Sequence, residues 1–431
     1  MTAPARASPQ RRGACPGLSV PMATGDGLLV RLLPIGTIAL DAFAGLCAAA
    51  RQHGNGIIEV TSRGSIQIRG LSATSAPRFA SAISALGIAA GDSIPVLTDP
   101  LAGLAPDEIV DAAALAADLR AALAQGSFAQ RLSAKASVTI DGGGTLDLDN
   151  IIADVRLHAE AVKGAAALCV SVGGDSRSAV PLGCIAGENA VEVTVRLLEI
   201  IARRGRHARA RDIVAAEGIA VFRAAVEDLL VASARPRLRG NARKEPIGLH
   251  PLRDGTFAYG VGLGFGHADA MSLQRLAEAA KAAGARGMRA APGRTLMIIG
   301  LTQQTAWPLA AAAAALGFIV RADDPRRHVV ACAGAPICAS ANIAARAIAP
   351  QIAAAAAPYL NGSFKIHISG CAKGCAHPAP AALTVVGTSS GSALVANGST
   401  RDAPFKIVTT NELPAAIAEI ARDHKHEDEN V

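Results

Sequence analysis

The sequence predicts an α+β protein with a duplicated architecture, in which each of two small repeats is followed by a larger α/β domain. Three observations support this fold class. The chain has 431 residues, of which 51% are hydrophobic, enough for several buried cores. Short strand patterns alternate with helical patterns along the chain. One order of turn, strand, helix and strands occurs twice, near residues 25–71 and 254–301.

The first repeat is expected to form a small domain over residues 18–75. Its predicted elements are, in order, a Gly-Asp-Gly turn at 25–27, an apolar strand at 28–33, a helix at 40–52 and strands at 57–60 and 65–70. The helix is predicted from apolar residues three and four positions apart, and the last strand from alternating side-chain character. Residues 1–17, rich in Pro, Arg and Ala, are expected to be mobile.

The second repeat is expected to form a similar domain over residues 246–302. Its predicted elements are a turn at 253–255, a strand at 256–261, a helix at 270–283 and a closing strand at 295–300. Both repeats begin with Asp-Gly and end with Gly-Leu at similar separations, which argues against a chance resemblance.

Each repeat precedes a larger segment that alternates helices and strands. The first, over 76–245, has predicted helices at 107–124 and 190–203 and predicted strands at 136–140, 151–155 and 168–172. The second, over 303–431, has a predicted helix at 305–316 and predicted strands at 365–368 and 383–386. We therefore expect four modules arranged as two pairs.

The composition favours an anionic ligand and argues against a nucleic-acid partner. The net charge is +7, whereas aromatic residues make up only 3% of the chain, too few for surfaces that stack on single-stranded nucleic acid. The sequence has no zinc-finger, RRM-like or basic-zipper pattern. An acidic small-molecule ligand is therefore the simpler explanation of the net positive charge.

No apolar stretch reaches the roughly 18 to 20 residues that a membrane-spanning helix needs. The best candidate, residues 307–320, suits a buried helix, and the N-terminal segment lacks the apolar core of a signal peptide. We expect no membrane partner and a cytoplasmic location. In that compartment the eight cysteines are expected to be thiols or metal ligands, not disulfides.

Four cysteines form two close pairs that indicate an iron–sulfur cluster. Cys332 and Cys338 form C-x5-C, and Cys371 and Cys375 form C-x3-C. Four thiolates are the ligands that a 4Fe-4S cluster requires, and the small residues around them leave room for inorganic sulfide. A structural zinc site usually has the tighter C-x2-C spacing, and four buried thiols acting as small apolar residues are the other alternative.

The remaining cysteines are scattered, and nothing near them indicates activation. Cys47 lies on the apolar face of a predicted helix, Cys169 lies in a predicted strand, and Cys15 and Cys184 lie in predicted loops. We expect all four to be unmodified thiols.

The cysteine spacing and the strand that contains residues 59–70 resemble the nitrite and sulfite reductase superfamily. Residues 61–70 match its Thr-x-Arg-x-x-x-Gln-x-x-Gly pattern, and the resemblance extends from about residue 15 to about residue 408. It implies two ferredoxin-like half-domain repeats, one before each larger domain. Within the superfamily, residues 15–17, 22–31 and 369–378 are most similar to the precorrin-3B synthase family.

The resemblance also implies which residues bind a polycarboxylate tetrapyrrole. The residues that match the basic and polar positions of the relatives are Arg63, Gln67, Arg69, Lys135, Arg156 and His158. Such a set is chemically reasonable, because a ring with many carboxylates needs several cationic partners and arginine can hold each carboxylate with two hydrogen bonds. The basic stretch at 203–211 also resembles one in the reductases; a solvated helix end is an equal interpretation.

The implied activity is dioxygen-dependent hydroxylation and lactonisation of precorrin-3A in cobalamin biosynthesis. A 4Fe-4S cluster would relay electrons from a reductase partner, and a mononuclear non-haem iron would activate dioxygen. The sequence shows no His-x-Asp or Glu spacing for that iron, so its ligands and the catalytic residues stay unassigned. His377 is a candidate ligand only because it follows Cys375 closely.

Two other functions remain open. A siroheme-dependent nitrite or sulfite reductase is disfavoured because Ile94 stands where the reductases have an anion-binding arginine. A non-catalytic iron–sulfur electron carrier would have no use for a polycarboxylate site. The glycine-rich stretch 260–266 resembles a phosphate loop, but it lies where the relatives have a plain strand-to-helix link, so nucleotide binding is not expected.

Overall fold

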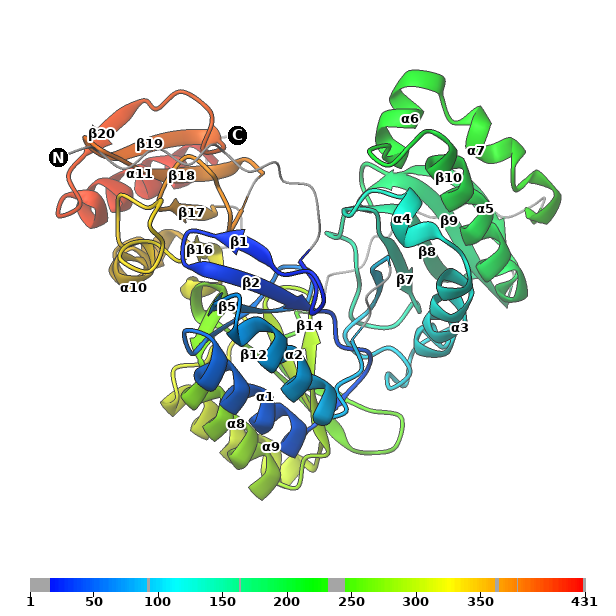
Figure 1. The fold of residues 1–431 in the computed structure, drawn as a ribbon, viewed down its shortest axis with the longest axis horizontal. Helices are drawn as coiled ribbons and strands as arrows, with labels where there is room; N and C mark the ends of the chain where they lie inside the picture. The colour runs from blue at the N-terminus through cyan, green and yellow to red at the C-terminus, as the bar shows by residue number, and fades with distance from the viewer. Residues whose placement is uncertain are drawn as a thin grey trace.

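The computed structural model describes residues 16–90, 94–162, 164–231, 245–360, 364–377 and 379–428. The expected mobile segment therefore lies almost entirely outside the described residues, as does Cys15. Figure 1 shows three lobes. Both repeats form the lower lobe, the first α/β segment forms the green and cyan lobe, and the C-terminal segment forms the orange and red lobe. No helix of the described residues is long and apolar enough to cross a membrane.

The two repeats contain similar elements in the same order. Those of the first are β1 (Met22–Thr24), β2 (Gly27–Leu32), β3 (Ile38–Ala39), α1 (Leu40–His53), β4 (Ile57–Val60), β5 (Ile66–Leu71) and α2 (Ser75–Ala85). Those of the second are β11 (Gly248–Pro251), β12 (Phe257–Gly262), β13 (His267–Asp269), α8 (Ala270–Ala282), β14 (Gly287–Ala291), β15 (Thr295–Leu301) and α9 (Gln303–Ala315). The predicted strands and helices of both repeats are confirmed to within a few residues.

The repeats exchange strands and share one core. The first sheet has the order β1-β2-β5-β4-β13 and the second the order β11-β12-β15-β14-β3, so each repeat donates its short strand to the other's sheet. Helices α2, α1, α8 and α9 lie side by side against these sheets (Figure 1). One apolar cluster contains residues of both repeats, including Phe43 and Phe79 from the first and Leu273 and Ile298 from the second. Burial of apolar surface therefore holds the two repeats together.

The larger segments are also similar to each other. The first contains β6 (Val96–Thr98), α3 (Ala112–Gln125), α4 (Phe128–Arg131), β7 (Val138–Asp141), β8 (Ala153–Val162), β9 (Ala165–Gly174), β10 (Val180–Ile185), α5 (Ala190–Arg203), α6 (Ala210–Glu217) and α7 (Ala220–Ala224). The second contains β16 (Val329–Ala331), α10 (Ala345–Ala356), β17 (Ile366–Ser369), β18 (Ala381–Thr388), β19 (Gly391–Gly398), β20 (Lys406–Val408) and α11 (Leu413–Asp428).

In chain order, the first three strands of each of these five-stranded sheets pair in parallel, and the last three pair in antiparallel fashion. The orders are β10-β9-β8-β7-β6 and β16-β17-β18-β19-β20. Each sheet has its own apolar core. The duplicated α+β class predicted from the sequence is therefore confirmed, with the duplication visible in the large domains as well as in the repeats.

The predicted helix at 107–124 begins later than expected, at Ala112. The Asp111 carboxylate accepts hydrogen bonds from the backbone N–H groups of Ala113 and Ala114, so it caps the first turn. The preceding residues form a loop in which Glu108 accepts from the N–H groups of Gly103 and Ala112. The local capping chemistry therefore sets the start of α3.

The expectation that no cysteine forms a disulfide is wrong for one pair. Cys169 in β9 and Cys184 in β10 are joined by a disulfide. Cys184 was expected in a loop, but it lies in a strand directly opposite Cys169 in the antiparallel register. Cysteines that face each other across two strands are close enough to bond, a proximity that sequence spacing alone does not reveal.

Candidate functional site

The four paired cysteines lie in loops at one edge of the C-terminal sheet. Cys332 follows β16 and Cys371 follows β17, and these strands are parallel neighbours that pair Ala331 with Ile368. The carboxyl ends of parallel strands meet at the same edge of a sheet, so both cysteines emerge there together. The Cys332 N–H donates to the Ile368 carbonyl at 3.1 Å, and the Gly370 N–H donates to Cys332 Sγ at 3.0 Å.

The Cys338 loop is held against the first repeat. Its neighbour Ala339 donates a backbone hydrogen bond to the Gly25 carbonyl at 2.9 Å. A Cβ atom added at Gly25 would lie 2.4 Å from Cys338 Sγ, so only glycine fits beside this sulfur. The Gly-Asp-Gly turn predicted at 25–27 is therefore a contact surface for the cysteine loop.

The cysteine sulfurs interact electrostatically. Burial raises the pKa of the Cys332 thiol, the N–H groups of Gly370 and Gly334 act against this rise, and the sulfurs of Cys371 and Cys338 add to it. Cys375 lies further out and is exposed. Its charge acts on Arg69, so the four cysteines border the same region of the molecule.

The donor set has the chemistry that an iron–sulfur cluster requires. Among the described residues, no three His, Cys, Asp or Glu side chains are close enough to hold a single metal ion. In a 4Fe-4S cluster the thiolates bind different irons, which places them further apart than the ligands of one ion. A backbone N–H directed at Cys332 Sγ also suits a thiolate ligand.

Two of the predicted substrate residues are committed to contacts within the first repeat. The Arg69 guanidinium makes two 2.8 Å hydrogen bonds to the Asp26 carboxylate and lies 3.7 Å from Glu59. Gln67, with its amide oriented to satisfy its neighbours, accepts from Arg31 and donates to Glu59. Arg69 and Gln67 therefore order the surface next to the cysteine loops.

Arg63 and Arg156 meet at one loop of the first α/β domain. Arg63 donates to the Ser137 hydroxyl and to the Ile152 carbonyl, and Arg156 donates to the Ile151 and Leu148 carbonyls. Arg156 is buried, and burial lowers its pKa. These two predicted residues lie together, although they are far apart in the sequence.

The other two predicted residues lie elsewhere in the same domain. Lys135 is exposed just before β7. His158 lies in β8 with its Nδ1 3.5 Å from an Asp141 carboxylate oxygen. Gln67 and Arg69 thus lie in β5, Arg63 lies in the turn before β5, and the other three predicted residues lie in the adjoining domain. The structure does not gather the six into one cluster.

Several buried or partly buried basic side chains near the cysteines were missed by the sequence analysis. Arg346 in α10 forms an ion pair with Glu59, yet its Nε and Nη1 have no hydrogen-bond partner. Arg294, Lys365 and His367 lie near the Cys371–Cys375 loop. No local pattern could have identified them, because strand and helix positions of this kind usually carry ordinary surface charges.

Ile94 is in the apolar core of the first α/β domain, 6% exposed. Its side chain packs in that core. That the missing arginine disfavours reduction of inorganic anions stays a prediction.

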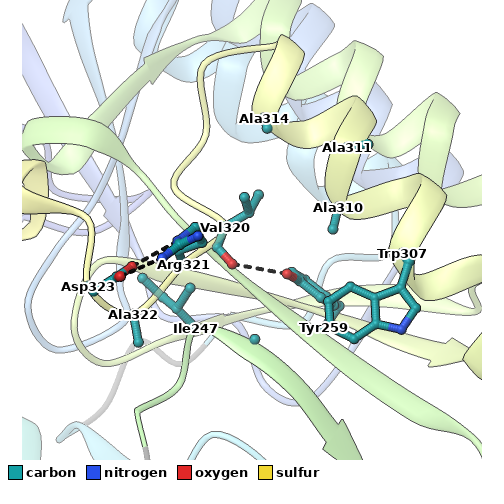
Figure 2. A pocket seen from close by; sticks show the side chains of 11 residues that line it. Ile247, Tyr259, Trp307, Ala310, Ala311, Ala314, Val320, Arg321, Ala322 and Asp323 are labelled. Carbon is teal, nitrogen blue, oxygen red and sulfur yellow. Dashed lines mark hydrogen bonds and ion pairs between the residues drawn. The ribbon is translucent and has the colours of Figure 1, made fainter.

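Two cavities in the described part of the chain contain none of the predicted site residues. One, of about 600 Å³, is lined by Tyr259 and Trp307 and by the neighbouring ion pair of Arg321 and Asp323 (Figure 2). The Tyr259 hydroxyl donates to the Val320 carbonyl at its edge (Figure 2). The other, of about 520 Å³, includes Leu101 and His250. The candidate site is thus defined by its donor chemistry and not by either of these cavities.

Comparisons with known proteins define the class of the fold. Residues 20–86 match the family model of the nitrite/sulfite reductase ferredoxin-like half domain. The NirA protein of Mycobacterium tuberculosis has a similar structure, with a TM-score of 0.74 and 21% identity over 92% of this chain and 80% of its own. The fold is that of the nitrite and sulfite reductases.

A precorrin-3B synthase of Sinorhizobium sp is 39% identical over 413 residues, which cover 96% of this chain and 88% of the relative. The chain belongs to the precorrin-3B synthase family. The resemblance recognised in the sequence is confirmed.

Proposed function

We propose that this protein is a precorrin-3B synthase of cobalamin biosynthesis. It hydroxylates precorrin-3A at the meso carbon between rings A and D and forms a lactone with the ring A acetate. One atom of dioxygen enters the product, and the other leaves as water with two electrons from a reductase partner. The observation that carries this proposal is the 39% identity to a precorrin-3B synthase over 96% of the chain.

We assign Cys332, Cys338, Cys371 and Cys375 as the ligands of a 4Fe-4S cluster. Such a cluster supplies single electrons when it is bound. The Gly370 N–H stabilises negative charge on the Cys332 sulfur, and the Gly25 turn keeps the Cys338 loop in place. Among the described residues, no group of three His, Cys, Asp or Glu side chains is placed to hold a mononuclear iron.

Strand β5 supports a substrate position between the cysteine loops and the first α/β domain. Arg63, just before β5, contacts that domain, whereas Arg69, six residues later, is acted on by Cys375. We propose that Arg63, Lys135, Arg156 and His158 bind substrate carboxylates along this path. Gln67 and Arg69 position the surface beside it.

The decisive experiment uses protein purified without oxygen, precorrin-3A, a chemical reductant and labelled dioxygen. Incorporation of one labelled atom into the product supports the proposal. Incorporation from water would refute it. Strong Soret absorption together with sulfite or nitrite reduction would indicate a siroheme enzyme. An intact cluster with no turnover would indicate an electron carrier.

A further inference from the structure

Four basic side chains from different parts of the chain meet beside the Cys371–Cys375 loop. They are Arg294, Lys365, His367 and His377, which we call the basic cluster. Arg294, in the turn between β14 and β15, has its Nη2 3.5 Å from the Ala376 carbonyl. The rings of His367 and His377 are 5.7 Å apart at an angle of 73°. The cluster therefore joins the second repeat to the C-terminal domain at the edge of the cysteine loops.

One member of the basic cluster lacks the partners that a buried polar group normally has, and the other three are partly buried around it. His367 is fully buried, and neither of its ring nitrogens has a hydrogen-bond partner. Burial and the charge of Arg294 lower the pKa of Lys365. Within the described residues, Glu59 is the acidic group that acts on Arg294, and Glu59 is already paired with Arg346 and Arg69. Unsatisfied buried polar groups are costly, so their presence indicates a missing partner.

The backbone around the cluster is strained in the way that functional sites often are. Phe265 and Arg294 both have positive φ values, 60° and 64°, which side-chain-bearing residues seldom adopt. Gly266 lies between them with φ of 89°, and a Cβ atom there would be 2.9 Å from Arg294 Cδ. The glycine thus makes room for the arginine side chain, and the strained turn directs that side chain into the cluster.

The sign of the charge decides which ligand fits. Two adjacent histidines could bind a metal cation, but Arg294 and Lys365 would repel it, and no third ligand stands within reach in the described structure. The same cations would attract an oxyanion, to which histidine nitrogens can also donate. A carboxylate would thus accept a hydrogen bond from the unpartnered His367 ring and compensate the positive charges of Arg294 and Lys365.

We propose that the basic cluster binds a carboxylate group of a polycarboxylate tetrapyrrole and so anchors that molecule beside the cysteine loops. The proposal rests on the proposed function for the identity of the tetrapyrrole. It assigns substrate recognition to the second repeat and the C-terminal domain, in addition to the first repeat and its α/β domain.

The test is a fluorescence titration of the whole protein with uroporphyrin, a porphyrin with eight carboxylates. Lys365→Met and Arg294→Gln are each expected to weaken binding about tenfold or more, the usual effect of losing a hydrogen bond to a charged group. Arg321→Gln is the matched control, because its side chain is 76% exposed and paired only locally with Asp323. Binding that is equal in all three variants, or absent in the wild type, would overturn the proposal.

A second measurement separates a binding role from a structural one. Lys365→Met removes a buried charge that Arg294 repels, so the ligand-free variant is expected to melt at a higher temperature than the wild type. A large decrease in melting temperature would show that Lys365 is needed for folding, which overturns the proposal.

Competing ligands distinguish the remaining sources of binding. Citrate or sulfate that binds as tightly as uroporphyrin, with the same dependence on Arg294, would assign the cluster to free anions and overturn the tetrapyrrole assignment. Ferrous ion binding that is lost in His367→Gln would overturn it as well. Turnover of precorrin-3A is measured separately. If turnover is normal but porphyrin binding does not depend on the basic cluster, only this inference is refuted. If porphyrin binding depends on the basic cluster but precorrin-3A is not turned over, only the proposed activity is refuted.

Discussion

Replacing Arg69 with alanine is expected to destabilise the protein strongly. The arginine makes two 2.8 Å hydrogen bonds to Asp26, and the two side chains are 10% and 2% exposed. Although burial favours the neutral form of Asp26, the hydrogen bonds and charge of Arg69 hold its pKa below the ordinary value. Without Arg69 the buried carboxylate keeps the hydrogen bond from the Thr24 hydroxyl but loses its ion-pair partner, a loss of about 3–5 kcal/mol.

This loss is measurable by urea unfolding at neutral pH, followed by circular dichroism. In a thermal scan the same loss is expected to lower the melting temperature by roughly 4 °C, from an unfolding entropy of about 2.1 cal/mol/K per residue over the whole chain. In the double variant Arg69→Met with Asp26→Asn, much of the loss should be recovered, because no unpaired charge remains. The control Arg321→Ala breaks an exposed ion pair and should cost less than about 1 kcal/mol.

The result that would refute this reasoning is specific. If Arg69→Ala kept its stability to within about 1 kcal/mol but bound uroporphyrin at least tenfold more weakly, Arg69 would be a direct substrate ligand. The ion pair with Asp26 would then be only a resting arrangement that the substrate displaces.

Three other predictions test the site and the fold. Serine at Cys332, Cys338, Cys371 or Cys375 should lower the iron and sulfide content measured chemically, and full iron retention in these variants would contradict the cluster assignment. The control Cys47→Ser should leave the content unchanged, because burial in α1 raises the pKa of the Cys47 thiol to about 12 and makes it unreactive. Removing the disulfide with Cys169→Ala and Cys184→Ala should lower the free energy of unfolding in urea by about 3 kcal/mol, since the disulfide closes a short loop between residues 15 apart. Equal thiol counts with and without reductant in denaturant would show that the disulfide does not form. Burial and the charges of Asp141 and Glu108 raise the pKa of Asp99 from 3.8 to about 8, so the folded state retains a proton that the unfolded state loses. The free energy of unfolding should therefore fall as the pH rises from about 4 to about 8. If the free energy of unfolding of Asp99→Asn fell equally steeply with pH, this carboxyl would be excluded as the cause.

The sequence was most informative where short-range patterns carry the information. Helix α1 was predicted at 40–52 and spans Leu40–His53, because apolar spacing and a glycine at its end are local signals. The start of α3 was predicted five residues early, because the loop before it is organised by Glu108 and Asp111 through contacts that a periodicity does not describe.

In the candidate site, too, the sequence contained the local signals but not the contacts between distant segments. Pairwise cysteine spacing identified the thiols, since ligands in one loop are close in sequence. Spacing could not show that Cys184 faces Cys169, nor that Arg69 is occupied by Asp26, 43 residues earlier in the chain. The basic cluster was missed because its members become neighbours only when the second repeat meets the C-terminal domain.

By itself, the sequence determined the succession of strands and helices, the duplication, the four paired cysteines and the resemblance to a family, because all of these are properties of neighbouring residues or of residue order. Only the tertiary structure decided that the repeats exchange strands and share a core, that two cysteines are joined, and which cations are already paired. The physical reason is that the partner of a charge, a thiol or a strand edge depends on contacts between distant segments, which only the folded chain brings together.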